Sequence, residues 1–505
     1  MFIGRREQLE ALSSLWGKRT SSLVTCRGRR RIGKSTLIEE FAKRTADHFI
    51  NITGLSPRKG MTDARQRKNF CEELADQTDG KVVGAKNWTM AFRALDERIP
   101  GGGRTVVLLD EISWMGSRNP DFAGYLKSAW DKRLKKHDSL VLVLCGSVSS
   151  WIAENILDST GFVGRDSLDL EVTDLSLAES VQMLGVTGMR LSPREIFDIL
   201  SVTGGVPKYL EDIRPELSFE ENVRQLCFMP RGTLFREFNE TFSEVFGKRT
   251  SSRGEVLRAL DAAPLSVVEI ARALGKTPNG KLSQVLRDLT YAGFVSRDSG
   301  LNPLTREPLR LERYRIKDNY TRFYLRFIEP RHQAIEKGLF EFSSVEQLGG
   351  WGSLLGLQFE NLVLNHITDL FVHFGLSRSL VLSAAPYCRR GGKGVKGCQI
   401  DLLIQTERMA LVVEIKRCKK IEHDIIREVR EKVASLEVSR ELSVRTALVY
   451  DGILSPSVEA DRYFDFILPF EKLLYGGSCP EGHGHSAHDL MRRMDFADRT
   501  LGRIK

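Results

Sequence analysis

A glycine-bounded loop followed by lysine and serine carries the clearest chemistry in this sequence. Gly28-Arg-Arg-Arg-Ile-Gly-Lys-Ser35 matches the pattern G-x-x-x-x-G-K-[ST] in full, between an apolar run and a helical pattern. Glycines let backbone N–H groups close around phosphate oxygens, and a helix N-terminus adds partial positive charge. Lys34 can neutralise the β- and γ-phosphates of ATP, and Ser35 can ligate Mg²⁺. The residues predicted to contact the nucleotide here are Gly28, Arg29, Arg30, Arg31, Ile32, Gly33, Lys34, Ser35 and Thr36.

An apolar run that ends in two acids supports this prediction. Val106-Val-Leu-Leu places Asp110 and Glu111 at the carboxyl end of a buried strand, where open α/β sheets bind ligands. Asp110 can hold the metal ion, and Glu111 can orient or deprotonate the attacking water.

Two further residues are candidates for the same site. Ser147 follows the apolar run Leu140–Cys145 and could lie between the metal ion and the γ-phosphate, or it could be an ordinary serine at a strand end. Arg165 could stabilise transferring phosphate charge as an arginine finger, or it could form a surface ion pair.

Three charged residues in the last third of the chain form a second candidate centre. Glu414 and Lys416 stand two apart in a strand-like run and therefore share a face, which Asp401 on the preceding run can reach. Carboxylates of Asp401, Glu414 and the helical Glu360 can bind Mg²⁺, and Lys416 can polarise a water molecule. The alternative is a half-exposed strand with a Glu–Lys neighbour pair. The basic stretch 389–396 could contact a phosphate backbone or be solvated loop charge.

The surrounding patterns predict the elements that position these residues. Short strands at Leu23–Cys26, Val106–Leu109 and Leu140–Cys145 alternate with helical patterns, which predicts a mainly parallel sheet within an α/β multidomain fold. Three short helices and a strand pair around residues 250–300 predict a winged helix-turn-helix. Its basic residues could contact DNA, or the unit could serve only for packing; they are Arg272, Lys276, Lys281 and Arg287.

Composition excludes several classes of protein. The 505 residues are 28% charged and 41% hydrophobic, and the net charge of +9 favours an anionic partner such as nucleotide or nucleic acid. No apolar run approaches the roughly 18 residues of a membrane span, so no membrane partner is expected. The eight cysteines form no Cys-x-x-Cys pair, and a reducing cytoplasm is the expected compartment. One Cys and three His at 479–488 could chelate a metal or be incidental.

Together the motifs resemble the archaeal-type ATPase family, a P-loop group near the AAA+ and STAND ATPases. The resemblance rests on Phe2–Leu9, Gly28–Ser35, Leu109–Glu111, Cys145–Ser147, Gly164–Arg165 and Gly204–Leu210. It implies that Gly4 and Arg5 lie near the adenine and that Pro207, in a helical lid, approaches the nucleotide. It also implies self-association, with Arg165 serving a neighbouring subunit.

The C-terminal centre resembles the PD-(D/E)xK restriction-endonuclease-like fold, because a helical Glu, an Asp and a Glu-x-Lys follow in its order. Ile400 stands where that fold has proline. Both resemblances imply an ATP-driven enzyme of DNA processing or defence, which binds ATP, docks DNA and cuts it. A nucleotide-controlled switch without nuclease activity and a transcriptional regulator remain alternatives.

The predicted domains follow from these patterns. They are a P-loop ATPase core at 1–175, a helical lid at 176–248, a winged helix at 249–312, a connector at 313–350, a nuclease-like domain at 351–475 and a polar tail at 476–505.

Overall fold

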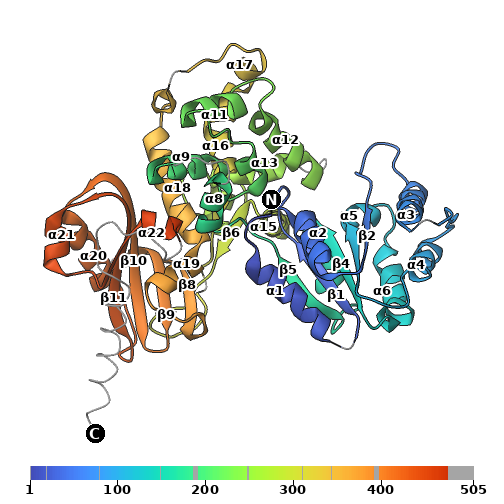
Figure 1. Ribbon diagram of the computed structural model, residues 1–505. Coiled ribbons are helices and arrows are strands. Elements are labelled where there is room, and N and C mark those ends of the chain that lie inside the picture. The colour runs from blue at the N-terminus through green and yellow to red at the C-terminus, as the bar shows by residue number, and fades with distance from the viewer. Residues whose placement is uncertain are drawn as a thin grey trace, which may run out of the picture.

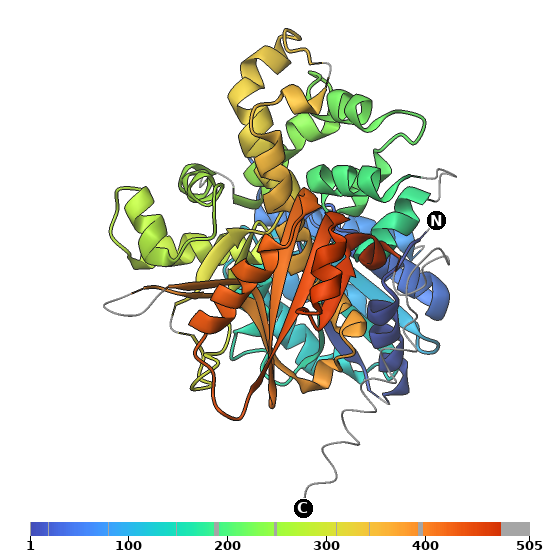
Figure 2. The same cartoon turned by 90° about the vertical axis from the view of Figure 1, so that its left-hand side faces the viewer.

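Two five-stranded sheets lie on either side of a block of helices in the computed structural model (Figure 1). After a quarter turn the C-terminal sheet stands in front of the N-terminal one (Figure 2). The structure describes residues 2–18, 20–78, 80–147, 149–185, 191–246, 250–309, 311–342, 344–391 and 397–475. The predicted tail, with its Cys and His residues, and most of the basic stretch 389–396 lie outside the described residues.

The N-terminal sheet consists of parallel strands in the order β2-β3-β4-β1-β5. Its strands are β1 (Ser22–Arg27), β2 (His48–Thr53), β3 (Thr105–Asp110), β4 (Leu140–Gly146) and β5 (Asp166–Glu171). Strands β1, β3 and β4 confirm the three predicted apolar runs. Because neighbouring strands are parallel, each connection must cross the sheet, and helices supply these crossovers.

Helices cover both faces of this sheet, as its buried central strands require. They are α1 (Arg6–Ser14), α2 (Lys34–Thr45), α3 (Asp63–Gln77), α4 (Trp88–Asp96), α5 (Ile112–Met115), α6 (Phe122–Lys132) and α7 (Ser149–Ile152). Leu12 and Ile38 of α1 and α2 belong to the core on one face. On the other face, the Trp88 ring packs edge-on against Phe70 and Phe122, with centroids 5.6 and 4.7 Å apart.

The segment after the sheet, for which the sequence predicts a helical lid, consists of helices that are interrupted between Thr203 and Pro207. Its helices are α8 (Leu177–Gly185), α9 (Pro193–Thr203), α10 (Pro207–Glu211), α11 (Phe219–Cys227) and α12 (Thr233–Phe246). Gly205 lets this break approach the core closely, because its carbonyl accepts a hydrogen bond from the Leu175 N–H at 2.8 Å. A Cβ at Gly205 would lie 2.5 Å from the Leu175 carbonyl oxygen.

Three helices and an antiparallel strand pair follow, as the sequence predicts. They are α13 (Thr250–Ala259), α14 (Val267–Ala273), α15 (Gly280–Tyr291), β6 (Val295–Asp298) and β7 (Arg313–Ile316). Ser266 caps α14 with a capping box, because its side chain accepts from the Glu269 N–H. The predicted domain boundary at 312/313 separates the two strands of this pair, so β7 belongs with β6 and not with the connector. We call residues 250–316 the three-helix unit.

The C-terminal sheet has mixed strand directions in the order β12-β11-β10-β9-β8. Pairs β8–β9 and β9–β10 are antiparallel, whereas β10–β11 and β11–β12 are parallel. Its strands are β8 (Val381–Arg389), β9 (Cys398–Thr406), β10 (Met409–Ile421), β11 (Ser443–Leu454) and β12 (Phe466–Pro469). The surrounding helices are α18 (Trp351–Asn365), α19 (Ile367–His373), α20 (Asp424–Ser435), α21 (Pro456–Asp461) and α22 (Phe470–Leu474).

One helix, α18, joins the C-terminal sheet to the rest of the molecule. The connector before it contains α16 (Asn319–Phe323), a π-helical turn (Tyr324–Ile328) and α17 (His332–Glu336). Gln358 on α18 donates 2.8 Å hydrogen bonds to the carbonyls of Ser201 and Asn319. His366 Nε2 lies 3.0 Å from the Leu175 carbonyl oxygen. A single apolar cluster therefore runs from the N-terminal sheet through the lid to the C-terminal sheet.

A search of the described residues finds no helix with the length and apolar character needed to cross a membrane.

Replacing Gly205 by alanine tests the contact between lid and core. We expect Gly205→Ala to destabilise the protein by roughly 1–3 kcal/mol, because the new Cβ meets a backbone oxygen that cannot move aside. Thermal unfolding of the full chain measures this as a lower midpoint. The control is Gly124→Ala in α6, where a Cβ has nothing within 4 Å and alanine favours the helix. Equal midpoints for both variants would contradict the prediction.

Candidate functional site

The glycine loop joins the buried strand β1 to the start of α2. Gly28 and Gly33 have φ of 151° and 83°, values that side chains disfavour. A Cβ at Gly28 would lie 2.2 Å from the Val172 carbonyl oxygen, so only glycine fits there. Lys34 folds back over the loop, and its Nζ donates to the carbonyls of Gly28 at 3.1 Å and Arg29 at 2.9 Å. The ammonium group and the N-terminus of α2 thus face the same small space, as phosphate binding requires.

The acid pair lies where the sequence predicts it, at the carboxyl end of β3. Ser35 Oγ donates to Asp110 Oδ2 at 2.6 Å, so the loop serine and the strand acid meet. Both are oxygen donors of the kind that Mg²⁺ prefers, so these residues fit the ion. Glu111 has a left-handed backbone, with φ of 48°, and its N–H donates to Asp110 Oδ1 at 2.9 Å. This turn directs the Glu111 carboxylate away from Asp110 and toward the next strand.

Ser147 connects the acid pair to the loop lysine. Its Oγ donates to Glu111 Oε1 at 2.5 Å, and its N–H donates to Glu111 Oε2 at 3.2 Å. The same Oγ accepts from Lys34 Nζ at 3.4 Å. Strand β4 lies between β1 and β3, which places a residue at its end between the two groups. The structure therefore brings Lys34, Ser35, Asp110, Glu111 and Ser147 together.

The N-terminal segment also reaches the loop. Arg5 is buried, and its guanidinium donates to the Ile32 carbonyl at 3.2 Å. The Arg5 N–H donates to Glu179 Oε1 at 2.7 Å, and a Cβ at Gly4 would clash with that carboxylate. Pro207 begins α10, and Tyr209 of the same helix accepts from the Arg29 guanidinium of the loop at 3.2 Å.

Two of the loop arginines direct their side chains away from the lysine. Arg29 pairs with Asp318 of the connector and Arg31 with Glu237 of α12, at 2.5 and 3.1 Å. Burial lowers the pKa of the Arg29 guanidinium, but the Asp318 carboxylate outweighs this effect and the pKa lies above its ordinary value. Arg30, partly buried, lies between them, and Thr36 is exposed on the first turn of α2. Nothing in the sequence indicated that these arginines bind acids roughly 200–290 residues away.

Arg165 forms an ion pair within its own chain. Its Nε donates to Asp131 Oδ1 at 2.8 Å, and its second nitrogen donates to Oδ2 at 3.1 Å. This bidentate ion pair, together with a contact from Lys127, lowers the pKa of Asp131 to about 2. Arg165 directly precedes β5, and its side chain is held by Asp131 of α6 and is not brought to the group around Lys34.

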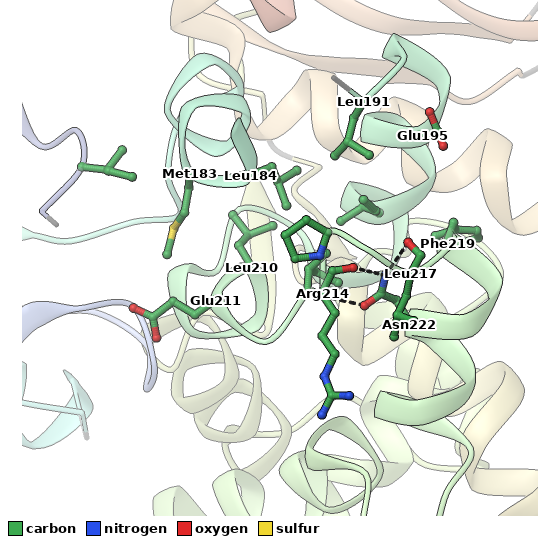
Figure 3. A pocket seen from close by; sticks show the side chains of 14 residues that line it. Met183, Leu184, Leu191, Glu195, Leu210, Glu211, Arg214, Leu217, Phe219 and Asn222 are labelled. Atoms are coloured by element: carbon green, nitrogen blue, oxygen red, sulfur yellow. Dashed lines mark hydrogen bonds between the residues drawn. The ribbon is translucent and has the colours of Figure 1, made fainter. Parts of the chain in front are cut away.

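The lid contains a cavity with a volume of about 240 Å³ (Figure 3). Apolar side chains from α8 to α11, among them Leu184, Leu210 and Phe219, line it together with Ile3. Asn222 closes one side, where its amide donates to the Arg214 carbonyl at 2.9 Å. Ile3 precedes Gly4, so the N-terminal segment contributes both to this cavity and to the loop.

A second group of charges lies on the C-terminal sheet. Asp401 and Glu414 occupy the antiparallel strands β9 and β10, next to the last registered pair Leu402–Val413, which places them opposite each other. Asp401 Oδ2 accepts from the Ile415 N–H at 2.9 Å. Burial and the Asp401 charge raise the pKa of Glu414 to about 7. They do the same to Glu360 on α18, whose pKa is also about 7.

Lys432 of α20 is a member of this group that the sequence analysis missed. Its ammonium donates to Glu414 and lies 3.6 Å from Asp401 Oδ1. Lys416, the predicted catalytic lysine, instead donates to Glu428 at 3.2 Å. Among the described residues no three acidic, His or Cys side chains are placed so that they could hold a metal ion. The predicted carboxylates lie close together, and the cation that pairs with Glu414 and Asp401 is the Lys432 ammonium group.

The sheet order, the phosphate loop between β1 and α2 and the acid pair on β3 define a P-loop nucleotide-binding fold. Residues 2–213 match the model of a family described as an ATPase domain predominantly from Archaea. An uncharacterized protein of Methanocaldococcus jannaschii is 23% identical over 440 residues, which are 85% of this chain and 92% of that protein. An uncharacterized ATP-binding protein of Pyrococcus abyssi is 26% identical over 229 residues, 42% of this chain and 69% of that protein.

Two solved structures are also similar. A Walker-type ATPase of Pyrococcus abyssi is 18% identical, with 65% of this chain and 96% of that chain covered and a TM-score of 0.45. The ORC2 protein of Aeropyrum pernix is 16% identical, with coverage of 66% and 94% and a TM-score of 0.39. The family match covers residues 2–213 and agrees with the family that the motifs of this part of the chain resemble.

Ser147 offers a test of the site with a matched control. We expect Ser147→Ala to lower the rate of ATP hydrolysis roughly 10- to 100-fold, because Glu111 loses the hydrogen bond from the Ser147 hydroxyl and its link to Lys34, and keeps only the bond from the backbone N–H. A phosphate-release assay measures the rate, and a fluorescent ATP analogue measures binding.

The control is Ser113→Ala. Ser113 is buried close to Gly146, and in the described part of the chain its hydroxyl has no hydrogen-bond partner. Its loss is expected to leave hydrolysis unchanged. Unaltered hydrolysis in Ser147→Ala would show that Glu111 needs no support from this residue.

Proposed function

We propose that this protein binds and hydrolyses ATP at the phosphate loop. The carrying observation is the hydrogen-bonded series Ser35–Asp110 and Glu111–Ser147–Lys34, which supports a site with a phosphate-binding lysine, a pair of metal ligands and a general base. ATP as the nucleotide is further supported by the match to an ATPase domain family and by the name of the relative from Pyrococcus abyssi.

Each residue has a defined task in this reaction. The α2 N-terminus and the loop N–H groups bind the phosphates, and Lys34 neutralises the β- and γ-oxygens. Ser35 and Asp110 hold Mg²⁺, which when bound supplies positive charge beside the phosphates. Glu111 orients the attacking water and accepts its proton, while Ser147 fixes the Glu111 carboxylate.

The placement of the base and the assembly of the protein are finer parts of the proposal. Arg5 touches the loop carbonyl of Ile32, which supports adenine binding along Gly4 and Arg5, with Pro207 closing the site from the lid. A homo-oligomer in which Arg165 serves a neighbouring nucleotide requires that Arg165 first leave Asp131. All described cysteines are unpaired, which suits a reducing compartment such as the cytoplasm.

DNA is the proposed second partner, bound through the three-helix unit as a winged helix. Arg272, Lys281 and Arg287 are exposed on α14 and α15, whereas Lys276 is paired with Glu255 at 2.7 Å. The Gln284 amide lies 3.4 Å from Glu154 Oε1 of the ATPase core. One side of α15 therefore packs on the core, and the basic side chains remain for phosphate contacts.

Cleavage of nucleic acid at the C-terminal carboxylates is the second candidate function. It is favoured by the opposed pair Asp401–Glu414 and by Glu360, whose pKa is raised to about 7 by burial and by the Asp401 charge. A divalent cation would have to displace the Lys432 ammonium from these carboxylates. If cleavage is absent, a nucleotide-controlled switch or a transcriptional regulator is the better description.

Two variants of the nucleotide site, one at Lys34 and one at Glu111, separate nucleotide binding from hydrolysis. Lys34→Ala is expected to weaken binding of a fluorescent ATP analogue at least about tenfold, because the phosphates lose their charged partner. Glu111→Gln is expected to bind within about threefold of wild type and to hydrolyse at least about 100-fold more slowly. Calorimetry and phosphate release are the measurements. Wild-type binding and turnover in Lys34→Ala would refute the proposed site.

A cleavage assay decides the second function. Plasmid, linear duplex and single-stranded RNA are incubated with wild type and Glu414→Gln, with Mg²⁺ or Mn²⁺ and with or without ATP. We expect wild type to cut at least one substrate and Glu414→Gln, which keeps the shape of the side chain but lacks its charge, to be inactive. Cutting by both proteins would place any nuclease elsewhere, and cutting by neither would favour the switch.

A further inference from the structure

The side chain of Arg29 links the phosphate loop to the second half of the chain. Its backbone carbonyl accepts from Lys34 at 2.9 Å, while its guanidinium donates to Asp318 Oδ1 at 2.5 Å and to Tyr209 Oη at 3.2 Å. The side chains of Arg29 and Asp318 are only 7% and 1% exposed. The guanidinium also lies over the rings of Tyr209 and Phe294, 5.6 and 5.9 Å from their centroids. One residue thus contacts both the catalytic lysine and the connector.

A second ion pair, between Arg31 and Glu237, extends the contacts of Arg29 into a network. Arg31 has a left-handed backbone, with φ of 68°, and its side chain pairs with Glu237 at 3.1 Å. Glu237 also accepts from Tyr209 Oη at 3.2 Å, which joins the two loop arginines through one tyrosine. Two cations face two carboxylates in this buried network, so the charges balance. Breaking one pair leaves an uncompensated buried charge, and the arrangement is therefore not free to shift gradually.

Asp318 joins the Arg29 ion pair to the connector helix α16. Its Oδ2 accepts from the Thr321 N–H at 3.0 Å and from the Thr321 hydroxyl at 2.5 Å, and so caps α16. One carboxylate oxygen therefore binds the phosphate loop while the other fixes the start of the helix.

Helix α16 in turn is hydrogen-bonded to α18. The Asn361 amide donates to Asn319 Oδ1 at 2.7 Å, and Arg322 donates to Gln358 Oε1 at 2.9 Å. Both α18 residues are buried and lie on either side of Glu360 in sequence, the residue that faces Asp401. From the loop to the C-terminal carboxylates, every step is an ion pair, a hydrogen bond or a single helix.

We propose that the Arg29–Asp318 ion pair couples the phosphate loop to the placement of α16 and α18, and through them to the C-terminal carboxylates. This inference rests on the proposed binding of nucleotide at the loop. Phosphate oxygens compete with the Gly28 and Arg29 carbonyls for the Lys34 ammonium, which changes the backbone that carries the Arg29 side chain. The connector, which is held to the loop by the Arg29–Asp318 ion pair, then moves with the loop. Asp318 is a positioning residue in this scheme and does not touch the reacting atoms.

The test measures nucleotide-dependent hydrogen–deuterium exchange in the full chain. Wild type, Asp318→Asn and Asp261→Asn are compared with and without Mg²⁺ and the non-hydrolysable analogue AMP-PNP. Asparagine at 318 still caps α16 but removes the charge that holds Arg29. Asp261→Asn is the matched control, because Asp261 pairs with Arg326 of the same connector at 2.9 Å. Calorimetry on the same samples reports AMP-PNP binding.

We expect AMP-PNP to change exchange in residues 319–328 and 351–366 of wild type and of Asp261→Asn. In Asp318→Asn this change is lost although AMP-PNP still binds. An unchanged nucleotide response in Asp318→Asn, or no response in a wild type that binds AMP-PNP, overturns the coupling. Loss of the response in both variants also overturns it, since any loosening of the connector would then suffice. A wild type that binds no AMP-PNP refutes the proposed function first, and the inference with it.

Discussion

The parallel register of β3, β4 and β1 is the constraint on which the nucleotide site depends. Cys26 pairs with Cys145, and Leu109 with Leu144, so the three strands end at one edge of the sheet. The loop, the acid pair and Ser147 lie directly at these strand ends, so the folding of the sheet alone brings them close together. Burial of these strands favours this register, because a slip of one residue would exchange the side chains that pack on the two faces of the sheet. The packing of the core thus sets the geometry of the nucleotide site, because each polar residue of the site lies at the end of a buried strand.

A different kind of interaction holds the two halves of the chain together. Around α18 the apolar cluster is interleaved with buried amides and guanidinium groups, such as Gln358, Asn361 and Arg315. Buried polar groups cost free energy unless they are satisfied, and here Asn361 reaches the Lys317 carbonyl at 2.6 Å as well as Asn319. Such an interface permits few alternative arrangements, because each shift leaves several groups without partners. It therefore favours a defined orientation of the C-terminal sheet relative to the nucleotide site.

Sequence patterns predicted the elements whose signals are local. The loop motif, the apolar strands β1, β3 and β4, and the helical pattern after the loop, observed as α2 (Lys34–Thr45), are all present. Strands β2 and β5 were missed because His-Phe-Ile-Asn-Ile-Thr and Asp-Ser-Leu-Asp-Leu-Glu lack the continuous apolar run by which the other three strands were predicted. The pairing of Arg29 with Asp318 spans 289 positions and leaves no trace in composition or spacing. Lys432 could have been found from the charged helical pattern of 424–435, but its distance to Glu414 depends on how that helix crosses the sheet.

Lys432 changes how the C-terminal carboxylates should be understood. Glu360 and Glu414 keep pKa values near 7 even with this ammonium present, because burial and the Asp401 charge outweigh it. The cluster therefore gains free energy from added positive charge, and Lys432 supplies some of it. A divalent cation would supply more, but only if the ammonium leaves and the carboxylates close around the ion. Lys432 lies on α20, Glu360 on α18 and the other two carboxylates on the sheet, so the packing of both helices on the sheet sets the distances between these charges.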